Sequence, residues 1–163
     1  MKWATIVLLG VVIAMGALAG CGHKSAATDK KPLEKAYGAE PDWNDPQRII
    51  ALNYQQTQGK RVFYDYCVWC HASSTPAGPS NMSNLKPAPA LANDGATLNS
   101  LSDDYLQNII TLGGSAMSKS AMMPPWGMTI KQEDIRSVVS FMRAIAQPAY
   151  RPSARPVSQY RGK

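Results

Sequence analysis

The residues whose types and spacing are most specific for chemistry lie in one pentapeptide near the middle of the chain. It reads Cys-Val-Trp-Cys-His and contains Cys67, Cys70 and His71. Two thiols separated by two residues can each add across one vinyl group of a porphyrin, and a histidine directly after the second thiol is then held beneath the iron as its proximal ligand. The pentapeptide therefore predicts the attachment site of one c-type haem.

Two other kinds of site can use paired cysteines, namely a redox-active disulfide and one half of a zinc site. A zinc site would need two more ligands, and the remaining cysteine and histidine, Cys21 and His23, lie far upstream. A dithiol oxidoreductase would be expected within a βαβ pattern, which the sequence around the motif does not show. The haem interpretation is therefore favoured.

An iron held by one histidine needs either a second axial ligand or an open position. Downstream, residues 121–127 read Ala-Met-Met-Pro-Pro-Trp-Gly. A thioether is a soft ligand that favours ferrous iron and raises the reduction potential, and the prolines stiffen the loop that carries it. Because any methionine can instead fill core space, several candidates stay open. They are Met123, Met122, Met117, Met128 and an open sixth site.

From about Pro46 to Gln147 the chain resembles the class I cytochromes c, which are small monohaem electron carriers. The shared features are the haem motif, a Pro-rich loop, a methionine before proline and a last helix. The resemblance implies a mostly α, cytochrome c-like fold, with three to four helices around one covalently bound haem and long irregular loops. It implies His71 and Met123 as the axial ligands, because in that family the ligand is the methionine that directly precedes proline.

The same resemblance implies two further contacts. A proline carbonyl in the loop 72–99 accepts a hydrogen bond from the outer ring nitrogen of the proximal histidine, and this fixes the orientation of the ring. The candidates are Pro79, Pro87 and Pro89. The first and last helices of the family also cross closely, with a glycine on one helix meeting an aromatic residue on the other. Gly59 and Phe141 fit these two positions.

Three segments show the spacing of apolar residues that predicts helices: 49–66, 102–113 and 129–146. Ser102 is expected to cap the second helix and Gly113 to end it. Thr129 and Gln132 can form a capping box at the start of the third. Gly59 is costly inside a helix, so it marks either a close helix crossing or a break before a shorter helix.

The amino-terminal residues predict export and a lipid anchor. Lys2 precedes an apolar run that ends in Leu-Ala-Gly-Cys at Cys21. This is typical of a secretory signal, and its end resembles a bacterial lipobox, in which Cys21 is lipidated and becomes the mature amino terminus. An uncleaved membrane anchor and an ordinary signal peptide are the alternatives, although the apolar run is at the short end for a membrane span.

The sequence thus divides into four predicted parts. These are a signal peptide (1–20), a flexible tether from lipidated Cys21 (21–46), a cytochrome c domain (47–147) and a Pro/Arg-rich extended tail (148–163). The tether is polar and rich in small residues without sustained periodicity. The tail begins with a proline at every fourth position from Pro148 to Pro156, which favours an extended, unpacked chain.

A net charge of +6 could indicate nucleic-acid binding, but the distribution of the charge along the chain argues against it. Residues 36–147 carry eight basic and nine acidic side chains, so the excess lies in the two ends of the chain. Basic ends beside a lipid anchor suit an anionic bilayer or an acidic partner surface. We therefore expect a membrane and redox proteins as partners, and no nucleic acid.

These observations predict a one-electron carrier rather than an enzyme, located at a bacterial membrane with its domain on the periplasmic or outer side. No catalytic residue is expected, because His71 serves the iron and His23 lies in the tether. One alternative is a fixed monohaem subunit of a larger membrane oxidoreductase complex. The other is a haem sensor or enzyme in which the distal methionine is labile.

Overall fold

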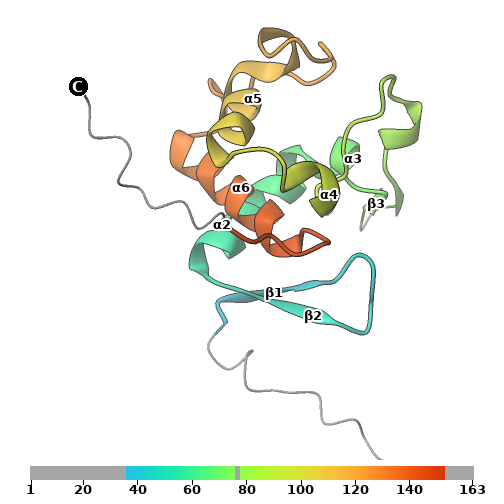
Figure 1. The fold of residues 1–163 in the computed structure, drawn as a ribbon, viewed down its shortest axis with the longest axis vertical. Helices are drawn as coiled ribbons and strands as arrows, with labels where there is room; N and C mark the ends of the chain where they lie inside the picture. Colours follow the sequence, from blue (N-terminus) through green and yellow to red (C-terminus); the bar gives the residue numbers. More distant parts are fainter. Residues whose placement is uncertain (1–35, 76–77, 153–163) are drawn as a thin grey trace, which may run out of the picture. The chain divides into compact units, whose positions relative to one another are not determined.

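The structure is a computed structural model that describes residues 36–75 and 78–152, all within one compact unit. The elements, in chain order, are β1 (Gly38–Pro41), β2 (Ile49–Leu52), α2 (Tyr54–Tyr66), α3 (Val68–His71), β3 (Ser74–Thr75), β4 (Gly78–Pro79), the 3₁₀ helix η2 (Met82–Asn84), α4 (Gly95–Leu98), α5 (Asp103–Ala116) and α6 (Gln132–Ile145). Figure 1 shows their arrangement. The prediction of a mostly helical fold is confirmed. The described residues form five α-helices rather than the predicted three to four. Two of these helices, α3 and α4, are single turns.

Helix α2 begins later than predicted, because residues 49–52 form a strand. β2 pairs with β1 in antiparallel register, with Ala39 opposite Ala51, and the two isoleucines that begin β2 favour strands. Asn53 then caps α2. Its side chain accepts a hydrogen bond from the backbone N–H of Gln56 at 2.9 Å, and the Gln56 side chain accepts one from the backbone N–H of Asn53 at 2.9 Å. This reciprocal capping box fixes the start of the helix.

The predicted tether through residue 46 is wrong for its described part, because the chain from β1 onward is folded. Glu40 is buried, and its carboxylate accepts hydrogen bonds from the indole N–H of Trp43 at 2.7 Å and from the phenol of Tyr64 at 2.6 Å. Lys60 lies 2.8 Å from the other carboxylate oxygen. The domain therefore starts at β1 and not at residue 47. Residues 1–35, with the predicted signal peptide and Cys21, lie outside the described residues.

The close crossing of the first and last long helices is confirmed, but its contacts differ from those predicted. Gly59 packs against the backbone of Ser137 on α6, where a Cβ would collide with the carbonyl of that residue. Phe141 lies one turn further along and instead meets Phe63 on α2, with ring centroids 5.5 Å apart. Both phenylalanines are fully buried, and this pair forms the centre of the core. Gly59 lies inside the helix, and no break occurs there.

The predicted ends of α5 and α6 are confirmed in part. Ser102 caps α5, and its hydroxyl accepts a hydrogen bond from the backbone N–H of Tyr105 at 3.1 Å. Gly113 has φ 79° and interrupts the helical backbone. The capping box of Thr129 and Gln132 is wrong, because α6 begins only at Gln132 and has no side-chain cap. The Gln132 side chain instead accepts a hydrogen bond from the hydroxyl of Thr111 at 3.3 Å.

The first residues of the predicted extended tail pack on the domain. The carbonyl of Pro148 accepts a hydrogen bond from the side chain of Asn99 at 2.9 Å. The ring of Tyr150 lies 4.1 Å from the guanidinium carbon of Arg143, within the range of a cation–π contact. The prediction of an unpacked tail from residue 148 is therefore wrong for residues 148–150. Residues 153–163 lie outside the described residues.

Candidate functional site

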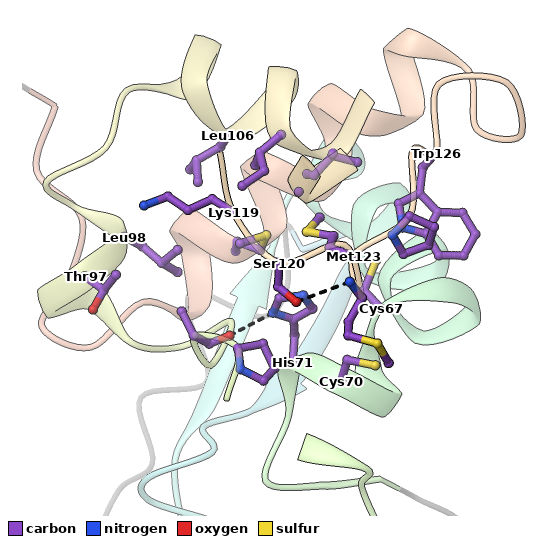
Figure 2. A pocket seen from close by; sticks show the side chains of 18 of the residues that line it. Cys67, Cys70, His71, Thr97, Leu98, Leu106, Lys119, Ser120, Met123 and Trp126 are labelled. Carbon is purple, nitrogen blue, oxygen red and sulfur yellow. Dashed lines mark hydrogen bonds between the residues drawn. The ribbon is translucent and has the colours of Figure 1, made fainter. Parts of the chain in front are cut away.

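A cavity of about 540 Å³ lies between α3, α5, α6 and the loops that connect them. Its walls are mainly apolar, and they include Leu98, Leu106 and Ile110. A cavity of this size and lining is typical of a site for a small organic cofactor. Figure 2 shows the side chains of Cys67, Cys70, His71 and Met123 gathered around it.

The two cysteines are positioned by the junction of α2 and α3. Cys67 ends one helix and begins the next, since its N–H donates to the carbonyl of Phe63 at 2.8 Å and its own carbonyl accepts from His71 N–H at 3.0 Å. Both thiols are free and line the cavity. Burial, and secondarily the neighbouring Cys70, raise the pKa of the Cys67 thiol to about 12. The folded protein thus holds two free thiols three residues apart at one edge of an apolar cavity.

The ring of His71 is oriented by the backbone of Ala90. The ring nitrogen Nδ1 lies 2.8 Å from the carbonyl oxygen of Ala90. Because a carbonyl can only accept, Nδ1 carries the proton and Nε2 keeps a free lone pair. Burial lowers the pKa of His71, and the hydrogen bond to Ala90 opposes this only in part. A neutral imidazole oriented through its second nitrogen is the usual form of a metal-bound histidine.

The predicted partner of His71 was a proline carbonyl, and this prediction is wrong. Pro89 is the residue before the one that accepts the hydrogen bond, and Pro87 lines the cavity nearby. Pro79 belongs to strand β4. The backbone of the loop is also held by a hydrogen bond from the N–H of Ala92 to the carbonyl of His71, at 2.8 Å. The carbonyl that accepts the hydrogen bond from His71 therefore belongs to the residue directly after a proline, and not to a proline itself.

The loop that carries Met123 is held against the end of α5 by backbone hydrogen bonds. The N–H of Gly114 donates to the carbonyl of Met123 at 2.9 Å, and Trp126 N–H donates to the carbonyl of Ile110 at 3.0 Å. Gly113, at φ 79°, leaves no room for a Cβ beside the backbone nitrogen of Pro125. Two consecutive glycines therefore let this loop approach the helix closely, which the sequence reading did not recognise.

The methionines differ in their relation to the cavity. Met123 is partly buried and packs against the core, whereas the side chains of Met122 and Met128 are 64% and 98% exposed. Met122 and Met142 also line the cavity, but Met117 and Met128 do not. The structure thus brings Met123 together with the two cysteines and His71. Its bond to iron stays a prediction.

A few polar residues line the cavity, and sequence reasoning did not identify them. They are Thr97, Tyr105, Ser118, Lys119 and Ser120. Lys119 is the one lysine or arginine among the described lining residues. An apolar slot with a single cation at its wall fits a flat apolar macrocycle that carries carboxylates. The described residues contain no group of three or more His, Cys, Asp and Glu residues that could hold a metal ion by themselves.

The comparisons with known proteins agree with this arrangement of residues. The model of one family, described as cytochrome C oxidase, cbb3-type, subunit III, matches residues 55–142. The match runs from α2 to α6 and includes the haem motif and Met123. No curated protein and no solved structure matches the chain. The matched segment covers more than half of the chain, which therefore belongs to this family and is a monohaem c-type cytochrome.

Proposed function

We propose that the protein is a one-electron carrier that holds a haem c through Cys67 and Cys70, with His71 and Met123 as axial ligands. We further propose that acylated Cys21 anchors it to a bacterial membrane, with the domain on the periplasmic or outer side. The observation that carries the proposal is that both cysteines, the oriented histidine and Met123 line one apolar cavity. Redox proteins are the proposed partners.

The chain's own residues supply what an electron carrier needs. Haem c, when bound, supplies the iron that takes up and gives up one electron. The Ala90 carbonyl holds the His71 ring in one orientation, and the hydrogen bond from Gly114 holds the Met123 backbone. A ring and a loop backbone held in place limit the movement that accompanies a change of oxidation state, which keeps reorganisation small. The apolar walls exclude water and favour the less charged, reduced state.

Covalent attachment is tested on the purified holoprotein. Because two thioether bonds join the cofactor to Cys67 and Cys70, acid–organic extraction should leave one haem on each denatured chain. Intact mass spectrometry checks the stoichiometry, and Cys67→Ala/Cys70→Ala is the control that should yield extractable haem or none. Haem that leaves the wild-type chain during extraction would contradict the attachment.

A second candidate function is favoured by the family match. The matching family is described as a subunit of a cytochrome oxidase, and a fixed electron-entry subunit would use the same haem chemistry with a permanent partner. Affinity purification after detergent extraction of native membranes separates the two functions. A stoichiometric membrane oxidoreductase in the eluate supports the subunit, and the cytochrome alone supports the mobile carrier.

A sensor or enzyme is the least favoured reading, because it requires an open or labile sixth position at the iron. Its signature would be rapid binding of carbon monoxide by the wild-type reduced protein. The backbone bonds that fix the Met123 loop argue for a closed site.

A further inference from the structure

Large exposed apolar side chains occur in two regions of the described chain. One group surrounds the cavity and the Met123 loop and belongs to the site described above. The other lies on and beside the β1–β2 hairpin, where Tyr37, Ile49 and Tyr54 are 72%, 48% and 61% exposed. This hairpin precedes the segment that the family model matches. The match therefore assigns the hairpin no role.

The strand register separates the hairpin into two faces. Glu40 and Leu52 are buried and lie toward α2 and the core, and the register places Ile50 on the same face. The alternate residues point the other way, since successive side chains of a strand alternate between its faces. We call this outward set the hairpin face; its members are Ala39, Pro41, Ile49 and Ala51, in which Ala39 pairs with Ala51 and Pro41 with Ile49.

The hairpin face is apolar throughout and is bordered by aromatic and cationic side chains. At one end, the rings of Tyr37 and Tyr54 meet edge to face with centroids 5.6 Å apart. At the other end lies Arg48, whose side chain is 58% exposed. Glu40 and Asp42 are buried and paired with Lys60 and Arg48, so the charges of each pair balance, and Asp45 between the two strands is exposed. Tyrosine beside an apolar patch is typical of side chains at a membrane–water interface.

Few residues separate the hairpin from the proposed lipid anchor in the sequence. About 15 residues separate Cys21 from Tyr37, a length that spans about 20–23 Å root-mean-square if flexible. Four lysines lie in this segment: Lys24, Lys30, Lys31 and Lys35. Basic residues beside an anchor are attracted to anionic lipid headgroups. Among the described residues, the first element after the proposed anchor is thus the hairpin that exposes this apolar face.

We propose that the hairpin face, with Tyr37 and Tyr54, rests on the headgroup layer of an anionic bilayer and orients the domain there. The proposal rests on the lipid anchor given under Proposed function. A short tether gives the face a high effective concentration at the membrane, so a weak contact suffices. In Figure 1 the hairpin lies on the opposite side of α2 and α6 from α5. This orientation turns α5 and the Met123 loop that it holds away from the lipid, toward a redox partner.

Lipid photocrosslinking tests the contact on the full holoprotein. The acylated protein is reconstituted in vesicles of equal parts phosphatidylcholine and phosphatidylglycerol, with a trace of phospholipid that carries a diazirine on its headgroup. Adducts are mapped by digestion and mass spectrometry. Within the folded domain, they should concentrate in peptides that contain residues 36–54. In the variant Tyr37→Ser/Ile49→Ser/Tyr54→Ser they should fall about tenfold or more, a factor that the loss of one buried aliphatic side chain can account for.

The matched control is Leu112→Ser, which removes a side chain of similar exposure from α5 (51% exposed) and should leave the hairpin adducts unchanged. The haem absorption spectrum checks that every variant is folded. Equal labelling of α5 and the hairpin would overturn the proposal. So would adducts that persist in the triple variant.

Failure of the anchor and failure of the contact give different results. Intact mass shows directly whether Cys21 carries acyl chains. If it carries none, the anchor is wrong, and the same vesicles are mixed with the unacylated protein. Labelling of the hairpin then supports the contact without an anchor, and its absence overturns the contact.

Discussion

Gly114 shows how a single residue can set the position of the proposed axial ligand, Met123. Its N–H donates to the carbonyl of Met123, and a Cβ at this position would collide with the backbone carbonyl of Ser120. The loop therefore lies closer to α5 than any residue with a side chain would allow. A change at Gly114 moves the backbone from which the Met123 sulfur projects.

We predict that Gly114→Ala weakens the bond between Met123 and the iron. The added methyl group forces the Ser120 carbonyl away, at a cost of about 1–3 kcal/mol for overpacking, and shifts the loop. The charge-transfer band of ferric haem with methionine ligation should weaken, and the reduced protein should begin to bind carbon monoxide. Ser115→Ala changes the exposed neighbour and is the control. A full-strength band in Gly114→Ala would show that the loop does not depend on this contact.

At this scale the sequence predicts what depends on local spacing. The motif at Cys67, Cys70 and His71 and the methionine before proline are local patterns, and the structure places all four residues at one cavity. The role of Ala90 lies in its backbone carbonyl, which any residue would supply. Lys119 reaches the wall only through the folded loop. Neither has a local signature, so neither could be predicted.

At the scale of elements, the long helices could be predicted, but the hairpin and the helix starts could not. The helical periodicity over 49–66 predicted one helix where the structure has β2 followed by α2. The apolar residues of a short strand also fit a helical pattern. The polar, small-residue composition before β2 suggested a flexible tether. Glu40 is buried only because Lys60, Tyr64 and Trp43 surround it, and these partners lie up to 24 residues away. Polar composition alone carries no information about such partners.

The contact between the hairpin and α2 predicts a pH effect on stability. Burial, and then the hydrogen bond to Glu40, raise the pKa of Tyr64 above its ordinary value of 10.0. The unfolded chain therefore loses this proton first as the pH rises. The stabilisation is fully present below pH 10.0 and is lost progressively above it, toward the raised pKa of the folded state. The unfolding free energy of the wild type should fall in this range.

The variant Tyr64→Phe should remove this part of the pH dependence. At neutral pH it should also lower the unfolding free energy by about 1.5–3 kcal/mol, because it removes a hydrogen bond to a charged group. Denaturant unfolding of the holoprotein from neutral pH to above pH 10.0 measures both effects. Tyr54→Phe, on the same helix but 61% exposed, should match the wild type. If the unfolding free energies of Tyr64→Phe and the wild type change in parallel with pH, this explanation is ruled out.

For the whole molecule, the charge distribution and the amino-terminal pattern predict attachment to a membrane. None of the described helices is long and apolar enough to span a bilayer. The segment around Cys21 lies outside the described residues, so the anchor stays a prediction from sequence. The organisation of the folded part differs from the prediction at both ends, because β1 and residues 148–150 pack on the domain. Such docking depends on contacts with distant residues.

The variant Cys21→Ser tests the anchor. Without the thiol no acyl chain can be attached, and two or more chains give stable membrane binding, at about 0.8 kcal/mol per buried CH₂. The variant should therefore be released from washed membranes or remain incompletely processed. Fractionation and intact mass spectrometry provide the measurement, with Ser25→Ala as the control. Unchanged processing and membrane retention in Cys21→Ser would count against lipidation.

The central claim is that Met123 closes the haem site and makes the protein an electron carrier. The most direct measurement compares Met123→Ala with Met122→Ala, the adjacent and more exposed methionine. Both holoproteins are examined for the ferric charge-transfer band, for carbon monoxide binding and for the midpoint potential.

Met123→Ala should lose the band, gain carbon monoxide binding and show a midpoint potential lower by on the order of 0.1 V, because the iron loses a soft ligand. Met122→Ala should match the wild type in all three respects. Loss of the band in Met122→Ala alone would move the ligand by one residue. A wild-type protein that already binds carbon monoxide rapidly would contradict the closed site, and with it the account of this protein as an electron carrier.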